Sequence, residues 1–187
     1  MTPWIYVLIG AVLALLLLWT VKRMMGFTAQ KPEDYEDRTP DFDIRKHLNG
    51  PIVCEGVIYG PTGRVSSRFV ADFHCAWDGD TGSMKEHFVY DDGSTQQREW
   101  HLHLSDGGAI RATAEDVVGE GSGRQTGPTV SLTYRIRLPE GAGGHVLDTV
   151  DWMYLTPNGT IMNRSQFRKF GIKVAELVAT MRPKDAA

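Results

Sequence analysis

The stretch MKEHFVYDDGSTQQREWHLHL, residues 84–104, decides the fold because it predicts a β-hairpin. Both arms alternate apolar and polar residues at a period of two, which is typical of strands with one buried face. The faces expected to point inward carry Met84, Glu86, Phe88 and Tyr90 on the first arm and Arg98, Trp100, Leu102 and Leu104 on the second. The rest of the globular part repeats the same pattern.

The turn of this hairpin must place both inward faces on one side of the sheet. A three-residue loop, 91–93, with Gly93 in the left-handed conformation, satisfies this condition by pairing Tyr90 with Ser94. A two-residue turn would rotate one arm by one residue and send its apolar side chains to the other face. The same pairing sets Glu86 opposite Arg98, an ion pair on an otherwise apolar face.

A second carboxylate is expected at this pair. If a five-residue loop, 105–109, follows the hairpin, then Arg98 also lies opposite Asp116, and the guanidinium lies between two carboxylates among aromatic side chains. One interpretation is a structural ion network, because a buried charge needs partners. The other is a fixed polar contact that orients the head group of an otherwise apolar ligand.

Composition narrows the class of protein. A chain of 187 residues has room for one domain with a sizeable core and appendages. Its net charge of -3 gives no support for a nucleic-acid partner. Its 20 glycines and 9 prolines, with few long helical periodicities, favour an all-β fold of short strands joined by tight turns.

The amino-terminal segment predicts a transmembrane helix. Residues 4–19 are unbroken apolar sequence, and roughly 19 residues in a helix span about 28 Å, close to the thickness of a hydrocarbon core. A cleaved signal peptide is the competing interpretation, but the basic start, short apolar run and small-residue cleavage site are absent from the sequence. Lys22 and Arg23 flank the carboxyl side only, which by the positive-inside rule favours a cytoplasmic domain.

The remaining chain divides into an anchor at 1–24, an acidic, proline-containing linker at 25–40, a barrel domain at 41–183 and a tail at 184–187. Residues 41–47 predict one helical turn or a lead-in segment. Besides the hairpin, strands are expected at 52–59, 64–77, 109–118, 130–138, 146–156 and 161–170, with a glycine-rich connection after 118. Residues 172–181 are interpreted as a strand, with a helix as the alternative. Eight or nine consecutive strands indicate an up-and-down antiparallel barrel or a strongly curved meander.

The expected interior combines aromatic walls with a few polar groups. The candidate ligand-binding residues are Glu86, Phe88, Arg98, Trp100, Asp116, Tyr134 and Trp152. Trp152 is included because it shares a phase with Val150 and Tyr154, and Asn163 is expected to point inward on a neighbouring strand. A ligand pocket needs such residues, and so does the filled core of a small barrel.

Other motifs are interpreted as structural. His101 and His103 share a strand face and resemble a zinc pair, but they alternate with apolar residues and are expected to face solvent without a third ligand. The glycine-rich residues 119–123 continue into a strand rather than a helix, so we expect a flexible hairpin loop and no phosphate site. The sequence predicts no catalytic residue, metal or cofactor.

The two cysteines are expected to remain free. The turn at 60–63 places Cys54 near Phe69 on the next strand, and Cys75 then lies roughly 20 Å farther along at about 3.3 Å per residue. A disulfide needs Cα atoms within about 7 Å. Cys75 shares a phase with Phe73 and is expected to be a buried thiol.

Four segments resemble the bacterial domain-of-unknown-function family 3833, a lipocalin-like group. They are FDIRKHLNGPIVCEGVIYGPTGRV, FVYDDGSTQQREW, ATAEDVVGEGSG and DTVDWMYLTPNGTIMNRSQFRKFGIKVAEL, and together the resemblance covers about 41–182. It implies a lipocalin-like barrel. Members are often lipoproteins, which implies a periplasmic domain, whereas this chain has a plain apolar helix where a lipobox would be. The family has no established activity, so no residue role is carried over.

Three functions follow as hypotheses. The first is a non-enzymatic barrel, held by a single-pass anchor in the bacterial inner membrane, that binds or hands over an apolar or amphiphilic, lipid-like molecule. The second is a structural or interaction protein with a solid barrel that docks a membrane partner. The third is an enzyme acting on a lipid-like substrate, with Glu86 or Asp116 as acid or base.

Overall fold

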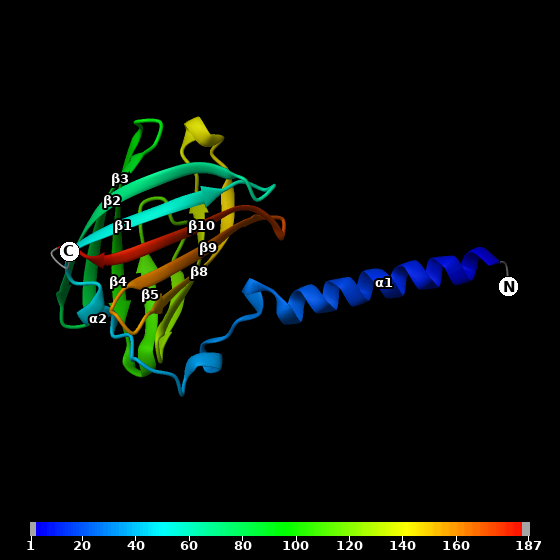
Figure 1. Ribbon diagram of the computed structural model, residues 1–187, viewed down its shortest axis with the longest axis horizontal. Helices are drawn as coiled ribbons and strands as arrows, with labels where there is room; N and C mark the ends of the chain where they lie inside the picture. The colour runs from blue at the N-terminus through cyan, green and yellow to red at the C-terminus, as the bar shows by residue number, and fades with distance from the viewer. Residues whose placement is uncertain (1–2, 185–187) are drawn as a thin grey trace.

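In the computed structural model, which describes residues 3–184, strands consecutive in sequence lie side by side in a closed antiparallel barrel (Figure 1). Within this part of the chain there are ten strands, and β1 closes the ring by pairing with both β2 and β10. They are β1 Gly50–Tyr59, β2 Val65–Asp78, β3 Thr81–Tyr90, β4 Thr95–Leu104, β5 Ala109–Thr113, β6 Gly121–Thr126, β7 Thr129–Arg137, β8 Val146–Leu155, β9 Ile161–Lys169 and β10 Ile172–Pro183. The predicted up-and-down barrel is therefore confirmed, and the open meander is wrong.

Helical elements lie outside the strands. They are α1 Pro3–Met25, α2 Ile44–His47 and the short 3₁₀ helices η1 Phe27–Ala29, η2 Pro32–Tyr35, η3 Asp106–Gly108 and η4 Glu140–Ala142. The expected amino-terminal helix is present as α1, which projects away from the barrel (Figure 1) and is long and apolar enough over Pro3–Val21 to cross a membrane. Residues 1–2 of the expected anchor and 185–187 of the expected tail lie outside the described residues.

The β3–β4 hairpin has the predicted pairing. The Tyr90 amide donates to the Ser94 carbonyl oxygen at 2.9 Å, and Gly93 has a φ of 83° in the left-handed region. Glu86 pairs with Arg98 in the ladder. The number of residues in the loop decides this pairing, because only a loop with an odd number of residues keeps the apolar faces of both strands inside the barrel.

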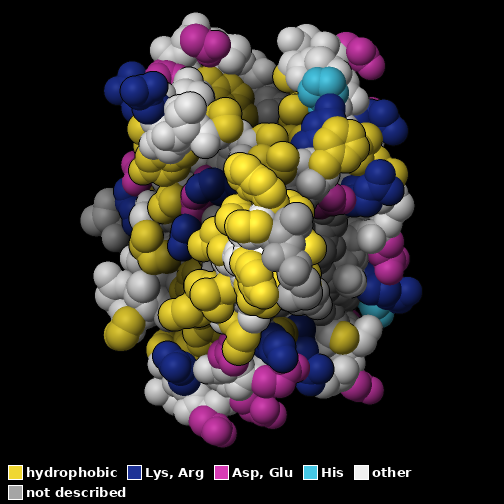
Figure 2. All heavy atoms as spheres, turned by 90° about the vertical axis from the view of Figure 1, so that its right-hand side faces the viewer, with side chains coloured by type: hydrophobic (Ala, Val, Ile, Leu, Met, Phe, Trp, Pro, Cys, Tyr) yellow, Lys and Arg dark blue, Asp and Glu magenta, His cyan; other side chains and the backbone are white. Residues whose placement is uncertain are grey.

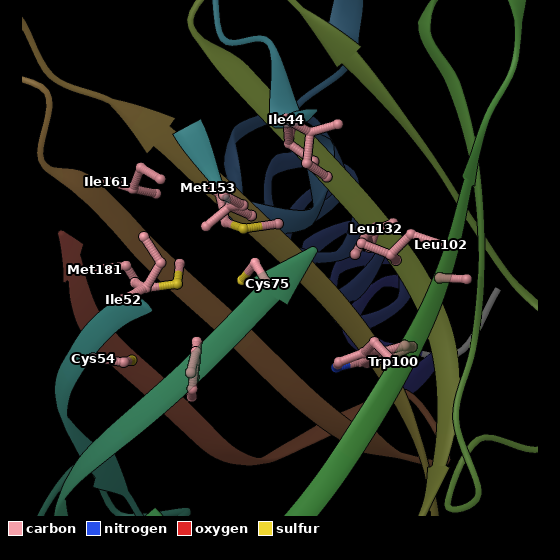
Figure 3. Packing of buried hydrophobic residues seen from close by; sticks show 14 of the residues in the cluster. Ile44, Ile52, Cys54, Cys75, Trp100, Leu102, Leu132, Met153, Ile161 and Met181 are labelled. Atoms are coloured by element: carbon pink, nitrogen blue, oxygen red, sulfur yellow. The ribbon is translucent and has the colours of Figure 1, made fainter. Parts of the chain in front are cut away.

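Alternation along each strand builds the core. On β2, Phe69, Ala71, Phe73 and Cys75 are buried, while the side chains that alternate with them are exposed. Figure 3 shows side chains from several strands, Trp100 and Met153 among them, pointing into the barrel. The last strand, β10, pairs with both β9 and β1, so the strand interpretation of 172–181 is confirmed.

The short helix α2 covers one end of the barrel. The Asp43 side chain caps it by accepting a hydrogen bond from the Arg45 amide at 3.0 Å. Ile44 and Leu48 are each only 1% exposed, and the Trp77 indole donates to the Leu48 carbonyl oxygen at 2.8 Å. The predicted helical turn therefore acts as a plug.

The expected glycine-rich loop after residue 118 is wrong, because Gly121–Thr126 forms β6 and raises the strand count to ten. A Cβ at Gly123 would collide with the Ser131 carbonyl oxygen, and one at Gly121 would lie 3.0 Å from the Tyr134 Cβ. These glycines let neighbouring backbone approach the strand closely. Glycine content alone does not distinguish such a strand from a flexible loop.

The expected strand 109–118 is also too long. β5 ends at Thr113, and a turn, in which the Val117 amide donates to the Ala114 carbonyl oxygen at 3.0 Å, diverts the chain toward β7. The Arg137 amide then donates to the Asp116 carbonyl oxygen at 2.7 Å. The β4–β5 ladder therefore covers only 101–104 of β4, and the barrel wall is split beside the first half of β4.

The segment expected to be a linker packs on the outer surface of β8 and β9. Tyr35 packs against Trp152 in a tilted arrangement with ring centroids 5.5 Å apart, and the Tyr154 hydroxyl donates to the Gln30 side-chain oxygen at 2.7 Å. The Arg164 guanidinium lies 4.6 Å from the centroid of the Phe27 ring. Most residues of 25–40 are polar, which favoured the linker interpretation although a few aromatic side chains hold the segment on the barrel.

Both cysteines are free, as predicted, and the predicted burial of Cys75 is confirmed; Cys54 is buried as well. Cys54 pairs with Ala71 rather than lying near Phe69. The turn pairs Gly60 with Arg64, one residue beyond the expected pairing, and an irregularity at Ile58/Tyr59 adds one more, so the β1–β2 pairing is shifted by two residues. A shift of two residues preserves which side chains face inward. Burial, the largest cause, raises the pKa of the Cys75 thiol to about 12, and burial raises the pKa of Cys54 as well.

Candidate functional site

A cavity of about 110 Å³ lies inside the barrel. Its wall is mostly apolar and carries a small number of polar side chains. The polar members are Glu86, Arg98, Tyr134, Asp151, Asn163 and Ser165. This composition, a few polar groups in an apolar wall, is typical of small-molecule sites.

Of the candidate residues, the structure brings Glu86, Phe88, Arg98, Trp100 and Tyr134 together around this cavity. They come from β3, β4 and β7. Their inward direction follows from the period-two pattern of each strand.

Two candidate residues do not line the cavity. The expectation that Trp152 points inward is wrong, because Asp151 and Met153 take the inward positions of β8 and Trp152 lies under Tyr35 on the outside. Trp152 is nevertheless only 3% exposed, because the segment before the barrel covers it from outside. Its apolar character therefore does not show whether it points into the barrel or away from it. Asp116 contacts Arg98 from the edge of the split wall.

The Arg98 guanidinium is shared unequally between its two carboxylates. Its Nε lies 3.0 Å from Asp116 Oδ1, and the two side chains are 13% and 23% exposed. The expected contact with Asp116 is present, although it crosses the split wall instead of a strand ladder. In the described part of the chain, the buried atoms Glu86 Oε2 and Arg98 Nη2 have no hydrogen-bond partner. Such atoms are uncommon in folded proteins and call for an explanation.

Aromatic rings surround this polar group. The Arg98 guanidinium carbon lies 4.1 Å from the Trp100 ring centroid and 5.8 Å from that of Tyr134. Phe88 packs against Phe69 and continues the apolar wall, with ring centroids 5.3 Å apart. Cation–π contacts of this kind stabilise a guanidinium away from water.

A second carboxyl group, on β8, was not predicted as part of the site. The Ser165 hydroxyl donates to Asp151 Oδ1 at 2.8 Å, and the Asn163 amide nitrogen donates to the same oxygen. Asn163 therefore faces inward as expected. The signal for Asp151 was the alternation Thr149, Asp151, Met153, which defines the buried phase of β8 once Trp152 is assigned to the other face.

Burial changes the proton affinity of both interior carboxyl groups. It raises the pKa of Glu86 to about 8, against the lowering effect of Arg98. It also raises the pKa of Asp151, despite the hydrogen bonds from Ser165 and Asn163. Glu86 is therefore mostly a neutral acid near neutral pH, able to donate as well as accept a hydrogen bond.

Arg98 keeps its charge. Burial by itself would lower the pKa of its guanidinium, but the neighbouring acidic groups of Tyr134, Glu86 and Asp116 raise it overall. The cavity thus contains one permanent cation, whose charge is matched by Asp116 at its edge.

At the split wall, Arg98 lies between this site and the outer surface. Arg98 lines the cavity and also an outer concavity of about 490 Å³ that contains Asp116 and Glu140. The ion pair between Arg98 and Asp116 therefore forms the barrier between the two spaces.

The histidine pair lies elsewhere. His101 and His103 alternate with the buried Leu102 and Leu104, on the outer face of β4. Among residues 3–184, there is no group of three or more His, Cys, Asp or Glu side chains arranged to hold a metal ion.

A closed antiparallel barrel with a mainly apolar interior cavity and a short helical plug is typical of the lipocalin-like class of folds. Within it, the chain belongs to the family described as "Protein of unknown function (DUF3833)", whose model matches residues 21–183. A comparison with curated proteins gave no match.

Two solved structures share the fold at low sequence identity. The S-type phycobiliprotein lyase CPES from Guillardia theta is 8% identical with a TM-score of 0.56, over 77% of this chain and 92% of that one. Rv2717c from M. tuberculosis is 15% identical with a TM-score of 0.54, over 79% of this chain and 99% of that one. At these identities the likeness establishes the fold alone.

Proposed function

We propose that the protein is a membrane-anchored, lipocalin-like barrel that binds or hands over a small amphiphilic, lipid-like molecule without converting it. In this proposal α1 is a single-pass anchor in the bacterial inner membrane, 25–40 is the linker, 41–183 is the binding domain and 184–187 is a tail. The observation that carries the proposal is the interior cavity, in which buried atoms of Glu86 and Arg98 lack partners beside an aromatic wall.

The electrostatics favour an uncharged polar end on the ligand. The charge of Arg98 is already matched by Asp116, and the raised pKa values of Glu86 and Asp151 favour their neutral forms. A hydroxyl or carbonyl group can use the free guanidinium N–H and the Glu86 carboxyl group as partners. An unpaired charge on the ligand would meet a desolvation cost that these residues do not offset.

The size of the cavity limits what it holds. Pockets for drug-sized ligands measure about 300–1,000 Å³, whereas this cavity measures about 110 Å³. The barrel as it stands therefore accommodates the end of an amphiphile. Parting the Arg98–Asp116 ion pair would join the cavity to the outer concavity and provide room for a longer chain.

The test is extraction of the purified full-length protein followed by mass spectrometry, together with displacement of a bound fluorescent fatty alcohol, whose polar end is uncharged, by the extracted molecule. Met153→Trp fills the cavity and is expected to abolish both signals, whereas Met162→Trp, on the exposed face of β9, is the matched control and should preserve them. Glu86→Gln keeps the volume of the side chain and should weaken binding of the fluorescent probe. This second variant keeps the test decisive if Met153→Trp fails to fold.

The proposal would be contradicted if the extract contained no lipid-like molecule and the folded wild-type protein did not bind the fluorescent probe. That result would favour the alternative, a structural protein whose outer surface docks a membrane partner. Turnover of a bound lipid would instead favour the enzyme hypothesis.

A further inference from the structure

The β9–β10 hairpin ends in two exposed apolar side chains. Phe170 is 90% exposed and Ile172 is 67% exposed, the highest values for large hydrophobic residues among the described residues outside α1. Gly171 lies between them. A tip of this kind has no contact with the core, so it contributes little to the stability of the barrel.

The backbone of this turn is unfavourable for phenylalanine. Phe170 has a φ of 52° and Gly171 a φ of 75°, which is the double left-handed geometry of a two-residue hairpin turn. Asn-Gly suits this turn, whereas an aromatic residue there is strained. Phe170 therefore costs stability without a packing gain inside the molecule, and backbone outliers of this kind gather at functional positions.

Cationic side chains flank the tip. The Arg168 guanidinium donates to the Gly171 carbonyl oxygen at 2.9 Å and braces the turn, and Lys169 Nζ lies 5.8 Å from the Phe170 ring centroid. Among the ion pairs of residues 3–184, neither Arg168 nor Lys169 has a carboxylate partner. Apolar side chains beside unmatched cations are complementary to an anionic lipid surface.

The hairpin points to the side of the barrel from which α1 leaves (Figure 1). Figure 2, which looks along α1 toward the barrel, shows Lys and Arg side chains together with apolar side chains on the face around the helix. The tip lies at the barrel end opposite α2, since β9 ends and β10 begins there. A membrane that holds α1 would therefore face the tip.

We infer that the β9–β10 tip, Phe170–Ile172, enters the head-group region of the anionic membrane that holds α1, giving the barrel a second membrane contact. This inference rests on the proposed anchoring role of α1. The packing of the segment before the barrel on β8 ties the barrel to α1. The tip adds a second membrane contact, which fixes the orientation of the barrel and holds the end opposite α2 against the lipid.

The test places an environment-sensitive fluorophore, NBD, on Ile172→Cys in the full-length protein. The matched control carries NBD on Asn158→Cys, in the β8–β9 turn at the α2 end. Cys54 and Cys75 are buried, so labelling is directed to the introduced thiol. Both proteins are reconstituted in phosphatidylcholine vesicles with and without phosphatidylglycerol, and quenching by nitroxide-labelled lipid is measured.

We expect quenching and a blue-shifted emission at position 172 and neither at 158. Lys169→Gln should weaken tip docking about fivefold in phosphatidylglycerol vesicles. Phe170→Asn should weaken docking about tenfold or more while stabilising the turn, a pair of opposite effects that misfolding does not produce.

Equal signals at 172 and 158 would overturn the inference, as would a blue shift at 172 without lipid quenching, which would indicate contact with protein. Equal quenching with and without phosphatidylglycerol would overturn the anionic preference. Each of these results leaves ligand extraction from the cavity unaffected, so failure of this inference is distinguishable from failure of the proposed ligand. Loss of the protein from vesicles at high salt and alkaline pH would instead contradict the anchor.

Discussion

Glu86 and Arg98 face each other across the β3–β4 ladder, yet the Arg98 guanidinium bonds to Asp116 and leaves Glu86 Oε2 without a partner. Burial raises the pKa of Glu86 to about 8, so its neutral form is favoured and this form does not need the cation as a partner. Asp116, at the edge of the wall, reaches solvent and remains the better ion-pair partner.

The first prediction concerns the stability contributed by Arg98. Removing one partner of a buried pair costs about 3–5 kcal/mol when the other charge stays uncompensated. Here Glu86 can stay protonated and Asp116 is partly exposed, so Arg98→Met is expected to be milder than Arg98→Ala, which also loses the contact with Trp100. We expect losses of about 1–2 kcal/mol for Met and about 3 kcal/mol for Ala.

Urea unfolding of the full-length protein in detergent, followed by tryptophan fluorescence, measures this difference. Equal, large losses in both variants would show that the carboxylates remain charged and buried. Wild-type stability in Arg98→Ala would contradict the pairing itself.

The second prediction is a pH dependence of stability that arises from Glu86. Its folded-state pKa of about 8 lies above the ordinary glutamate value of 4.5, so the folded state binds more protons than the unfolded state between these values. Stability should therefore fall as pH rises from about 5 to 8, with a slope of up to about 1.4 kcal/mol per pH unit. The raised pKa of Asp151 acts in the same direction.

Glu86→Gln removes this titration and should flatten the curve, whereas Glu115→Gln, at an exposed position, is the control that should not. The free energy of unfolding is measured at several pH values across this range. Parallel curves for wild type and Glu86→Gln would contradict the assignment.

These two predictions rest on a pair that the sequence identified correctly, and the reason is geometric. Parity in the 84–104 hairpin leaves one loop length that keeps Trp100 and Phe88 inside, so the Glu86–Arg98 pairing follows from local information. The closed barrel followed from the same alternation repeated along the chain, and the helix–strand ambiguity at 172–181 was decided by its β-branched residues.

The errors have a different origin. Trp152 is buried by Tyr35, a residue distant in sequence, and a period-two pattern does not reveal which face such a segment covers. Gly121 and Gly123 lie in a strand because neighbouring backbone comes close, which is a tertiary requirement. The wrong assignment of Trp152 also explains why Asp151 was missed, because adjacent residues of a strand point to opposite faces and an inward Trp152 places Asp151 outward.

The third prediction tests the packing of the segment before the barrel. A Cβ at Gly127 would collide with the Tyr35 carbonyl oxygen, and Gly127 has a φ of 49°. Gly127→Ala should therefore displace residues 26–40 and speed proteolytic cleavage there. Gly159→Ala is the matched control, because its φ of 83° gives similar backbone strain while the space around it is open.

Limited proteolysis with mapping of the cleavage sites measures the effect, and Tyr35→Ala should reproduce it by removing the contact with Trp152 directly. Protection of 26–40 in Gly127→Ala, equal to that in the Gly159→Ala control, would show that the segment is not held by this contact.

The fourth prediction uses the cysteines, whose burial also determines how the membrane side of the domain can be established. Cys54 is 4% exposed and Cys75 is 2% exposed, and burial raises the pKa of both thiols, so neither should react with a maleimide in the folded protein. Alkylation under denaturing conditions should add two labels, because no disulfide joins them. Modification of either thiol in the native state would contradict the packing around β1 and β2.

Because both native thiols are buried, an impermeant reagent applied to intact cells reports the membrane side of the barrel only through an introduced exposed cysteine such as Asn158→Cys. Labelling of that variant before lysis would place the barrel in the periplasm, and protection until lysis would place it in the cytoplasm, as the positions of Lys22 and Arg23 predict.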